Sequence, residues 1–107
     1  MARRLGRRTA GPVPRVAWLP EALRDILRLN DFLAGKSPQA ARNAVLCIQA
    51  AARQLESFPE IGKPLGDGRR ELFAAFGAGA YVLRYRLEEG GQPVVIRVWH
   101  TREWRGS

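Results

Sequence analysis

Residues 80–99, AYVLRYRLEEGGQPVVIRVW, decide the fold. Apolar side chains alternate with others along residues 81–87, and again along residues 94–99, a period of two that is typical of β-strands. Two adjacent glycines lie in the segment between these runs, which predicts a turn and an antiparallel hairpin. A third alternating run, residues 71–76, ends at a glycine-containing turn at 77–79. We therefore expect a three-stranded antiparallel meander at the C-terminal end of the domain.

Two stretches of helical period precede these strands. Pro20 is suited to the first turn of one helix, and Ser37 with Pro38 predicts the start of a second, with the Ser37 hydroxyl as its N-cap. The apolar face expected for the first helix consists of Leu23, Ile26, Leu27, Asn30 and Leu33. The face expected for the second consists of Ala41, Val45, Ile48, Ala52 and Leu55. Small alanine side chains let helices approach closely, which favours an antiparallel helical hairpin over residues 20–57.

A short strand candidate at residues 15–18 comes before the helices. The element order β-α-α-β-β-β predicts an α+β domain of two layers, with the helical hairpin packed on a small antiparallel sheet. We accordingly divide the chain into a flexible basic leader, residues 1–14, and a single domain, residues 15–107.

Composition excludes several classes of protein. A single cysteine, Cys47, rules out an intramolecular disulfide framework, and with a single histidine, His100, it rules out a metal site rich in Cys or His. No apolar run approaches the roughly 20 residues that a membrane-spanning helix needs. We expect a cytoplasmic protein with no membrane contact, no metal and no cofactor.

The charge is unevenly distributed. The net charge is +8, and sixteen of the eighteen basic residues are arginines. Residues 1–15 hold five arginines and no acid, whereas residues 69–107 hold seven arginines and four acids. Surfaces of this kind attract nucleic acid or an acidic protein partner.

One face of the predicted sheet is unusually rich in arginine. If the last hairpin is regular, the side chains packed on the helices are Tyr81, Leu83, Tyr85, Val94, Ile96 and Val98. The opposite face then carries Arg84, Arg86, Arg97 and Trp99, and Arg102 and Trp104 follow it. Arginine with aromatic residues favours binding of RNA or of an acidic peptide. The alternative is an ordinary solvent-exposed face, whose arginines pair with Glu88, Glu89 or Glu103.

His100 ends the last predicted strand. A lone histidine is more often structural than catalytic, but Arg97, Arg102 and Glu103 nearby would suit an acid/base in phosphodiester cleavage. Glu71 and Glu103 are the acids near the basic third of the chain that could act as a base.

Seven short motifs across residues 15–105 together resemble the RelE/ParE superfamily of toxins from type II toxin–antitoxin modules. They are Val16-Ala17-Trp18 with Ala22-x-x-Asp25-Ile26, Ser37-Pro38-x-Ala40-Ala41, Leu55-x-x-Phe58-Pro59-x-x-Gly62, Arg70-Glu71-Leu72, Tyr81-Val82-x-x-Tyr85-Arg86, Val94-Val95-Ile96 and Val98-x-His100-x-Arg102. The β-α-α-β-β-β architecture of that superfamily agrees with the order that the periodicity predicts.

The resemblance implies one of two activities. ParE-like members poison DNA gyrase without a recognised nuclease site, and RelE-like members cleave mRNA on the ribosome with lysine, arginine and a late tyrosine or histidine. This chain has only Lys36 and Lys63, and its His100-x-Arg102 ending is similar to that of ParE-like members, which favours the gyrase activity. The residues that would contact the target or antitoxin are Arg84, Arg97, Trp99, Arg102 and Trp104.

In the alternative, an mRNA endoribonuclease, Arg84 and Arg86 would hold the scissile phosphate and His100 would transfer a proton. A third reading is a nucleic-acid-binding module that uses the leader and the arginine face. Both toxin readings imply a cognate antitoxin that forms a hetero-oligomer with this chain and binds operator DNA through its own DNA-binding half.

Overall fold

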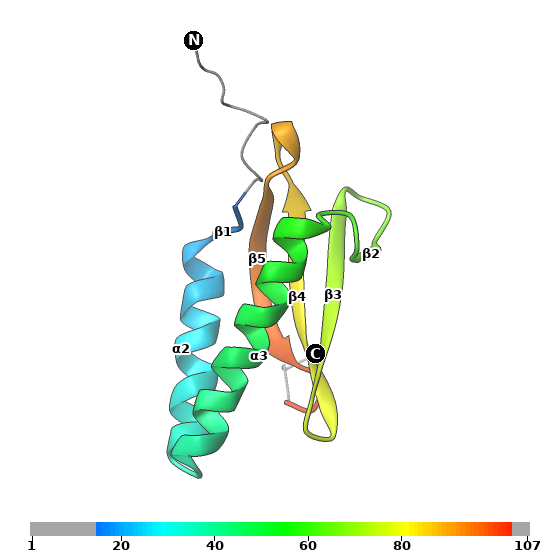
Figure 1. Ribbon diagram of the computed structural model, residues 1–107. Coiled ribbons are helices and arrows are strands. Elements are labelled where there is room, and N and C mark those ends of the chain that lie inside the picture. Colours follow the sequence, from blue (N-terminus) through cyan, green and yellow to red (C-terminus); the bar gives the residue numbers. More distant parts are fainter. Residues whose placement is uncertain (1–14, 104–107) are drawn as a thin grey trace.

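A helical hairpin covers one face of a five-stranded sheet in the computed structural model, which describes residues 15–103 (Figure 1). The leader, residues 1–14, and residues 104–107 lie outside the described part of the chain. The elements are β1 (Ala17–Trp18), α2 (Pro20–Ala34), α3 (Pro38–Ser57), β2 (Lys63–Pro64), β3 (Arg69–Phe76), β4 (Gly79–Leu87), the 3-10 turn η1 (Glu89–Gly91) and β5 (Pro93–His100). This arrangement confirms the predicted two-layer α+β class.

The sheet has the strand order β1-β5-β4-β3-β2, and its central meander of β3, β4 and β5 is antiparallel as predicted. The sheet as a whole is mixed, because β1 joins β5 in parallel, with Ala17 opposite Val94. β2 lies between α3 and β3, where no strand was predicted, and pairs with β3, with Lys63 opposite Glu71. β1 lies within the strand candidate expected at residues 15–18, whereas β2 is only two residues long, too short for a periodic pattern to reveal it.

Both helices begin where the sequence predicts. Pro20 opens α2, and the Ser37 hydroxyl accepts a hydrogen bond from the Ala40 backbone N–H at 3.1 Å. The residues of α3 that are buried are Ala41, Ala44, Ile48, Ala51 and Leu55. Ala44 and Ala51, which flank the predicted stripe in the sequence, are thus buried in place of Val45 and Ala52.

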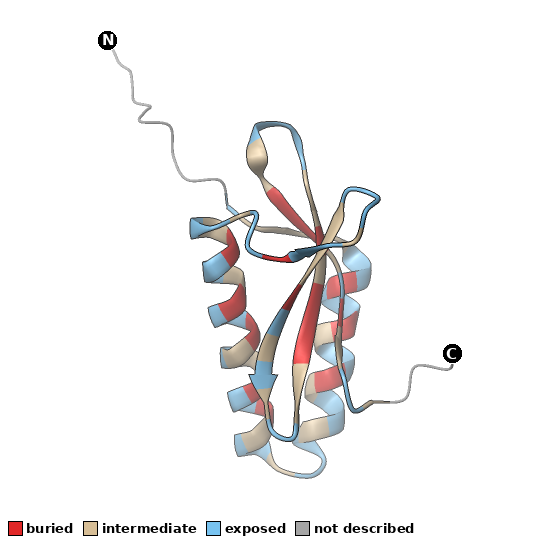
Figure 2. Ribbon diagram, turned by 90° about the vertical axis from the view of Figure 1, so that its right-hand side faces the viewer, coloured by how far each residue is buried: buried red, intermediate tan, exposed pale blue. Residues whose placement is uncertain are grey.

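The buried face of α2 differs from the prediction. Leu23 and Leu27, expected in the core, are 50% and 62% exposed. Ala22, Asp25 and Leu29 are buried in their place, and the burial colours mark the inner stripes of both helices (Figure 2). A carboxylate occupies this stripe because hydrogen-bond donors of β5 meet it there, as described below.

A β-bulge changes which residues of β5 enter the core. Arg84 lies opposite Arg97, but the next residue, Tyr85, lies opposite Val95, so Ile96 is an extra residue in β5. An inserted residue reverses the faces on one side of the bulge. The core cluster therefore includes Val95 and not Val94 or Ile96, contrary to the expectation of a regular hairpin. Tyr81, Leu83, Tyr85 and Val98 belong to the core as predicted.

The loop after α3 is tied to the sheet by a buried tyrosine. The Tyr85 hydroxyl donates to the Pro59 carbonyl and accepts from the Gly62 N–H, both at 2.8 Å. A Cβ atom at position 62 would lie 2.5 Å from the same hydroxyl oxygen, so any larger residue would force the tyrosine to shift. These contacts explain why Pro59, Gly62 and Tyr85 occur together in the motifs quoted above.

No helix within residues 15–103 is long and apolar enough to cross a membrane.

Candidate functional site

The sheet face turned away from the helices carries an aromatic row across three strands. Phe73 on β3, Val82 on β4 and Trp99 on β5 are cross-strand neighbours. Val82 is only 1% exposed although it lies on the side opposite the core, whereas Phe73 is 52% exposed. This aromatic row (Phe73, Val82, Trp99) is a small apolar patch on an otherwise charged surface.

The next row on the same face holds Glu71, Arg84 and Arg97. Arg84 donates from Nε and Nη2 to one carboxylate oxygen of Glu71, at 2.9 and 2.6 Å. Its guanidinium carbon lies 5.0 Å from the ring centre of Trp99, a cation–π contact. Arg84 is thus held on one side by a carboxylate and on the other by an indole.

The other two arginines predicted for this face are also paired with carboxylates. Arg86 pairs with Glu88 at 2.6 Å, as the alternative of an ordinary solvent-exposed face predicted. Arg97 does not extend over the open face, because its guanidinium donates to both oxygens of Asp25 on α2, at 2.8 and 3.0 Å. Within residues 15–103, Glu89 and Glu103, the other acids named in that alternative, form no ion pair with these three arginines. A phosphate group would have to compete with a bound carboxylate at each of the three.

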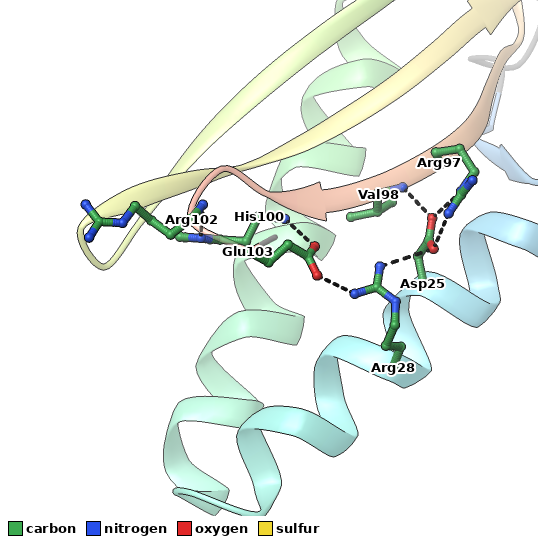
Figure 3. A network of polar contacts seen from close by, with 7 residues as sticks. All are labelled: Asp25, Arg28, Arg97, Val98, His100, Arg102 and Glu103. Atoms are coloured by element: carbon green, nitrogen blue, oxygen red, sulfur yellow. Dashed lines mark hydrogen bonds and ion pairs between the residues drawn. The ribbon is translucent and has the colours of Figure 1, made fainter. Parts of the chain in front are cut away.

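Asp25 is the centre of a polar network between α2 and β5 (Figure 3). Besides Arg97, it accepts from the Val98 backbone N–H at 2.9 Å and from Arg28 at 3.2 Å. Burial by itself raises the pKa of a carboxyl group, but the hydrogen bonds from Arg97, Val98 and Arg28 outweigh it and lower the pKa of Asp25. The pairing between β5 and β1 ends at Val95. Further along the same edge of β5, the Asp25 carboxylate accepts the hydrogen bond of the Val98 N–H in place of a neighbouring strand.

The network continues to the C-terminal turn. Arg28 forms an ion pair with Glu103, and the other carboxylate oxygen of Glu103 accepts from the His100 backbone N–H at 2.9 Å. Figure 3 shows that this chain of contacts joins the middle of α2 to the end of β5, whereas the Arg102 side chain points away from it. Glu103, considered as a possible base, is therefore already engaged by two donors.

His100 has both ring nitrogens in hydrogen bonds. Nε2 lies 2.9 Å from the Phe76 carbonyl, which can only accept, and Nδ1 accepts from the Arg102 backbone N–H at 3.1 Å. These partners fit a ring whose hydrogen lies on Nε2, which then donates to the Phe76 carbonyl. The ring also makes edge contacts with Phe76 and Tyr81, at centroid distances of 6.2 and 4.9 Å. Glu103 and the backbone of Arg102 lie beside it as predicted, but Arg97 is turned to Asp25.

A groove of about 550 Å³ opens between the second half of α2 and the ends of β3, β4 and β5. Its walls are mainly apolar and include Leu29, Leu33, Phe76 and Tyr81. His100, Arg28, Arg102 and Glu103 also line it. The groove therefore lies next to the polar network and shares residues with it.

Sequence reasoning missed three of these features: the central role of Asp25, the exposed Phe73 and the groove. A signal for Asp25 existed, because Ala22, Asp25 and Leu29 recur at helical spacing and place an acid within a buried stripe. Nothing comparable marks the groove, whose walls come from four separate elements. Trp104, predicted as a contact residue, lies outside the described residues.

Comparisons with known proteins place this arrangement in a family. A helical hairpin on a sheet of this kind occurs in a solved structure described as "Chromosomal ParDE TA system from P. aeruginosa", with a TM-score of 0.66 at 18% identity over 82% of this chain and 96% of that one. Residues 16–104 match the family described as "ParE toxin of type II toxin-antitoxin system, parDE". The chain belongs to this family of the RelE/ParE superfamily and is the toxin component of a type II toxin–antitoxin module.

Two relatives come from Caulobacter vibrioides. Toxin RelE3 is 36% identical over 86 residues, which cover 80% of this chain and 92% of the relative. Toxin RelE1 is 39% identical over 84 residues, which cover 78% of this chain and 89% of the relative. Membership of the family implies a cognate antitoxin.

Proposed function

We propose that the protein inhibits bacterial growth from within the cytoplasm by poisoning DNA gyrase, and that its cognate antitoxin neutralises it. The observation that carries this proposal is the pairing of the guanidinium groups of Arg84, Arg86 and Arg97 with carboxylates. A face whose arginines are already neutralised is poorly suited to hold a scissile phosphate. The same face is well suited to dock on another protein.

The aromatic row would form the centre of this docking surface. Tryptophan and arginine are enriched among residues that contribute most to protein–protein binding, particularly where they lie together. Trp99 lies beneath Arg84, and Phe73 extends the apolar surface. Arg97, another predicted contact residue, would take part only from the edge of this surface, because its guanidinium is bound to Asp25. The remaining predicted contact residues, Arg102 and Trp104, follow β5 in the sequence.

His100 provides a second reason to favour binding over cleavage. Proton transfer at Nδ1 or Nε2 would break the hydrogen bond to the Arg102 N–H or to the Phe76 carbonyl. A histidine with both nitrogens committed is better explained as a residue that fixes the end of β5.

A ribosome-dependent mRNA endoribonuclease is the second candidate, and the names of the relatives RelE1 and RelE3 favour it. Here Arg84 and Arg86 would bind the phosphate after leaving Glu71 and Glu88, and His100 would act as the acid/base. A plain nucleic-acid-binding module is the third candidate, and would use the leader with the arginine face.

The antitoxin would contribute an acidic segment that is disordered until it wraps the basic C-terminal third of the toxin. We propose that the two chains form a hetero-oligomer that represses its own operator through the DNA-binding half of the antitoxin.

Induced expression in a bacterium that lacks the antitoxin tests the proposal, with growth and a DNA-damage reporter read together. Gyrase poisoning predicts arrest with the reporter switched on, retained in His100→Ala and lost in Trp99→Ala. Phe58→Ala, which changes an exposed aromatic residue outside this face, serves as the control.

Arrest with a silent reporter and a loss of about 10²-fold or more in His100→Ala would instead establish the nuclease. Binding to nucleic acid without arrest would support the third candidate.

A further inference from the structure

One edge of the sheet is covered over only part of its length. The short strand β2 pairs with β3 at Arg70 and Glu71, and so covers the first half of β3 (Figure 1). No strand within residues 15–103 pairs with the outer side of the second half, residues 72–76. This free edge (residues 72–76) offers backbone hydrogen-bonding groups to another chain.

The pairing of β3 with its neighbours shows which backbone groups point outward. The Leu65 N–H donates to the Arg69 carbonyl, which therefore points away from β4. Every second residue of a strand directs its N–H and C=O to the same side, so those of Phe73 and Ala75 also point outward. Within the described part of the chain these groups have one weak contact, from the Cys47 thiol to the Ala75 carbonyl at 3.5 Å.

The free edge lacks the features by which proteins usually block strand addition. Lysine, proline, other charged residues and bulges serve this purpose on edge strands. β2 has Lys63 and Pro64, whereas residues 72–76, with the sequence LFAAF, contain no charge and no proline and pair with β4 in regular register. Phe73 is 52% exposed, and Ala75 is exposed as well. An exposed apolar edge of this kind favours pairing with another strand.

We propose that two copies of this chain pair through their free edges, antiparallel and about a two-fold axis at Ala74. This register places Phe73 opposite Ala75 of the second copy, and Ala75 opposite Phe73 of the second copy. Each such pair exchanges two backbone hydrogen bonds. An aromatic ring then lies beside a methyl group on both sides of the axis, where cross-strand side chains are close enough to pack. The two sheets become one continuous sheet.

The chemistry of the free edge favours a second copy over the antitoxin. The antitoxin segment proposed above is acidic, and residues 72–76 contain no basic side chain to attract it. A copy of the same apolar sequence matches this edge by symmetry, as two-fold interfaces require. The ladder is short, because Lys63 of β2 already lies opposite Glu71. An interface well below about 1,200 Å² gives weak association, so we expect a reversible dimer that forms as the protein concentration rises.

Sedimentation velocity of the full-length chain at rising protein concentration tests the proposal. The dimer should become tighter with added salt, because each copy carries a net charge of +8. Ala75→Lys should weaken it by about tenfold or more, because it places a charge opposite Phe73 of the second copy at two symmetric positions. Ala78→Lys is the matched control, since it adds the same charge to an exposed residue of the turn, outside the free edge, and should leave the dimer unchanged.

Amide hydrogen exchange of the unaltered chain, followed by NMR, locates the contact. The N–H groups of Phe73 and Ala75 should exchange more slowly as the concentration rises, whereas those of Leu72 and Ala74, which point to β4, should not change. A chain that stays monomeric up to about 1 mM, or a dimer that leaves the Phe73 and Ala75 amides unprotected, would overturn the proposal. Protection of these amides that requires the antitoxin would also overturn it, and would assign the free edge to the antitoxin. None of these outcomes depends on whether gyrase or mRNA is the target.

Discussion

Asp25 in the middle of α2 binds Arg97 of β5 through two hydrogen bonds, and accepts the Val98 backbone N–H with the same carboxylate. Only 4% of Asp25 is exposed, so its charge depends on these donors rather than on water. The contact fixes α2 beside the edge of the sheet and withdraws Arg97 from the open face. It thereby shapes both the groove and the surface that we propose for target binding.

Replacing Asp25 by asparagine should reduce the free energy of unfolding by about 2 kcal/mol, because hydrogen bonds to a charged group are lost in a buried place. Urea denaturation of the purified chain measures the change. Asp31→Asn, which removes an exposed acid from the same helix, should alter it by less than about 0.5 kcal/mol. Equal effects of the two substitutions would contradict the importance of the network.

Acid should remove the stabilisation that Asp25 provides. The pKa of Asp25 is lower in the folded protein than the usual value of about 3.9 that applies to the unfolded chain. A carboxyl group whose pKa is lower in the folded protein contributes its full stabilisation at pH values above its pKa in the unfolded chain. This contribution is lost as the pH falls through its pKa in the folded protein. The difference in unfolding free energy between the wild type and Asp25→Asn should therefore be constant near neutral pH and shrink below about pH 4.

Tyr85→Phe should destabilise the protein by about 1–3 kcal/mol, because it leaves the Gly62 N–H and the Pro59 carbonyl without their partner. Tyr81→Phe is the control: Tyr81 is equally buried, and its hydroxyl makes no hydrogen bond within residues 15–103. Thermal or urea unfolding should show a clearly larger loss of stability in Tyr85→Phe than in Tyr81→Phe. A Tyr81→Phe variant as unstable as Tyr85→Phe would show that the hydroxyl bonds are unimportant.

Gly62→Ala should cost about 1–3 kcal/mol, because the added methyl group overlaps the Tyr85 ring and hydroxyl. Gly35→Ala provides the comparison, since a Cβ there meets its nearest atoms at 3.7 Å and the backbone is already helical. The melting temperature of Gly35→Ala should equal or exceed that of the wild type. Similar losses in both variants would argue against the close approach of Tyr85.

Glu71→Gln should release Arg84 for contact with phosphate. We expect the affinity of the toxin for single-stranded RNA to depend more steeply on salt in this variant, by about 0.7 in the slope of log K against log salt. Glu60→Gln removes the same charge from an exposed position, so it controls for net charge. Equal slopes in both variants would mean that Glu71 does not restrain Arg84 in solution.

Some features of the site could be read from local sequence, and others could not. The bulge in β5 illustrates the limit, because the run from Val94 to Val98 reads as a regular alternation until Ile96 proves to be an extra residue. Strand register depends on which residues of β4 lie opposite, and this information is absent from β5 alone. The error changed the identity of core residues but left Arg84, Arg97 and Trp99 on neighbouring positions of one face.

The sequence by itself determined the two helices, their starts at Pro20 and Ser37, the antiparallel meander and the richness of its outer face in arginine. These follow from periodicity and from capping, which act over a few residues. The tertiary structure alone decided that the arginines are paired, since Asp25 and Arg97 are 72 positions apart in the chain. The sequence alone does not show whether a charged side chain on an exposed strand has an ion-pair partner. Whether a carboxylate neutralises it depends on how distant elements pack.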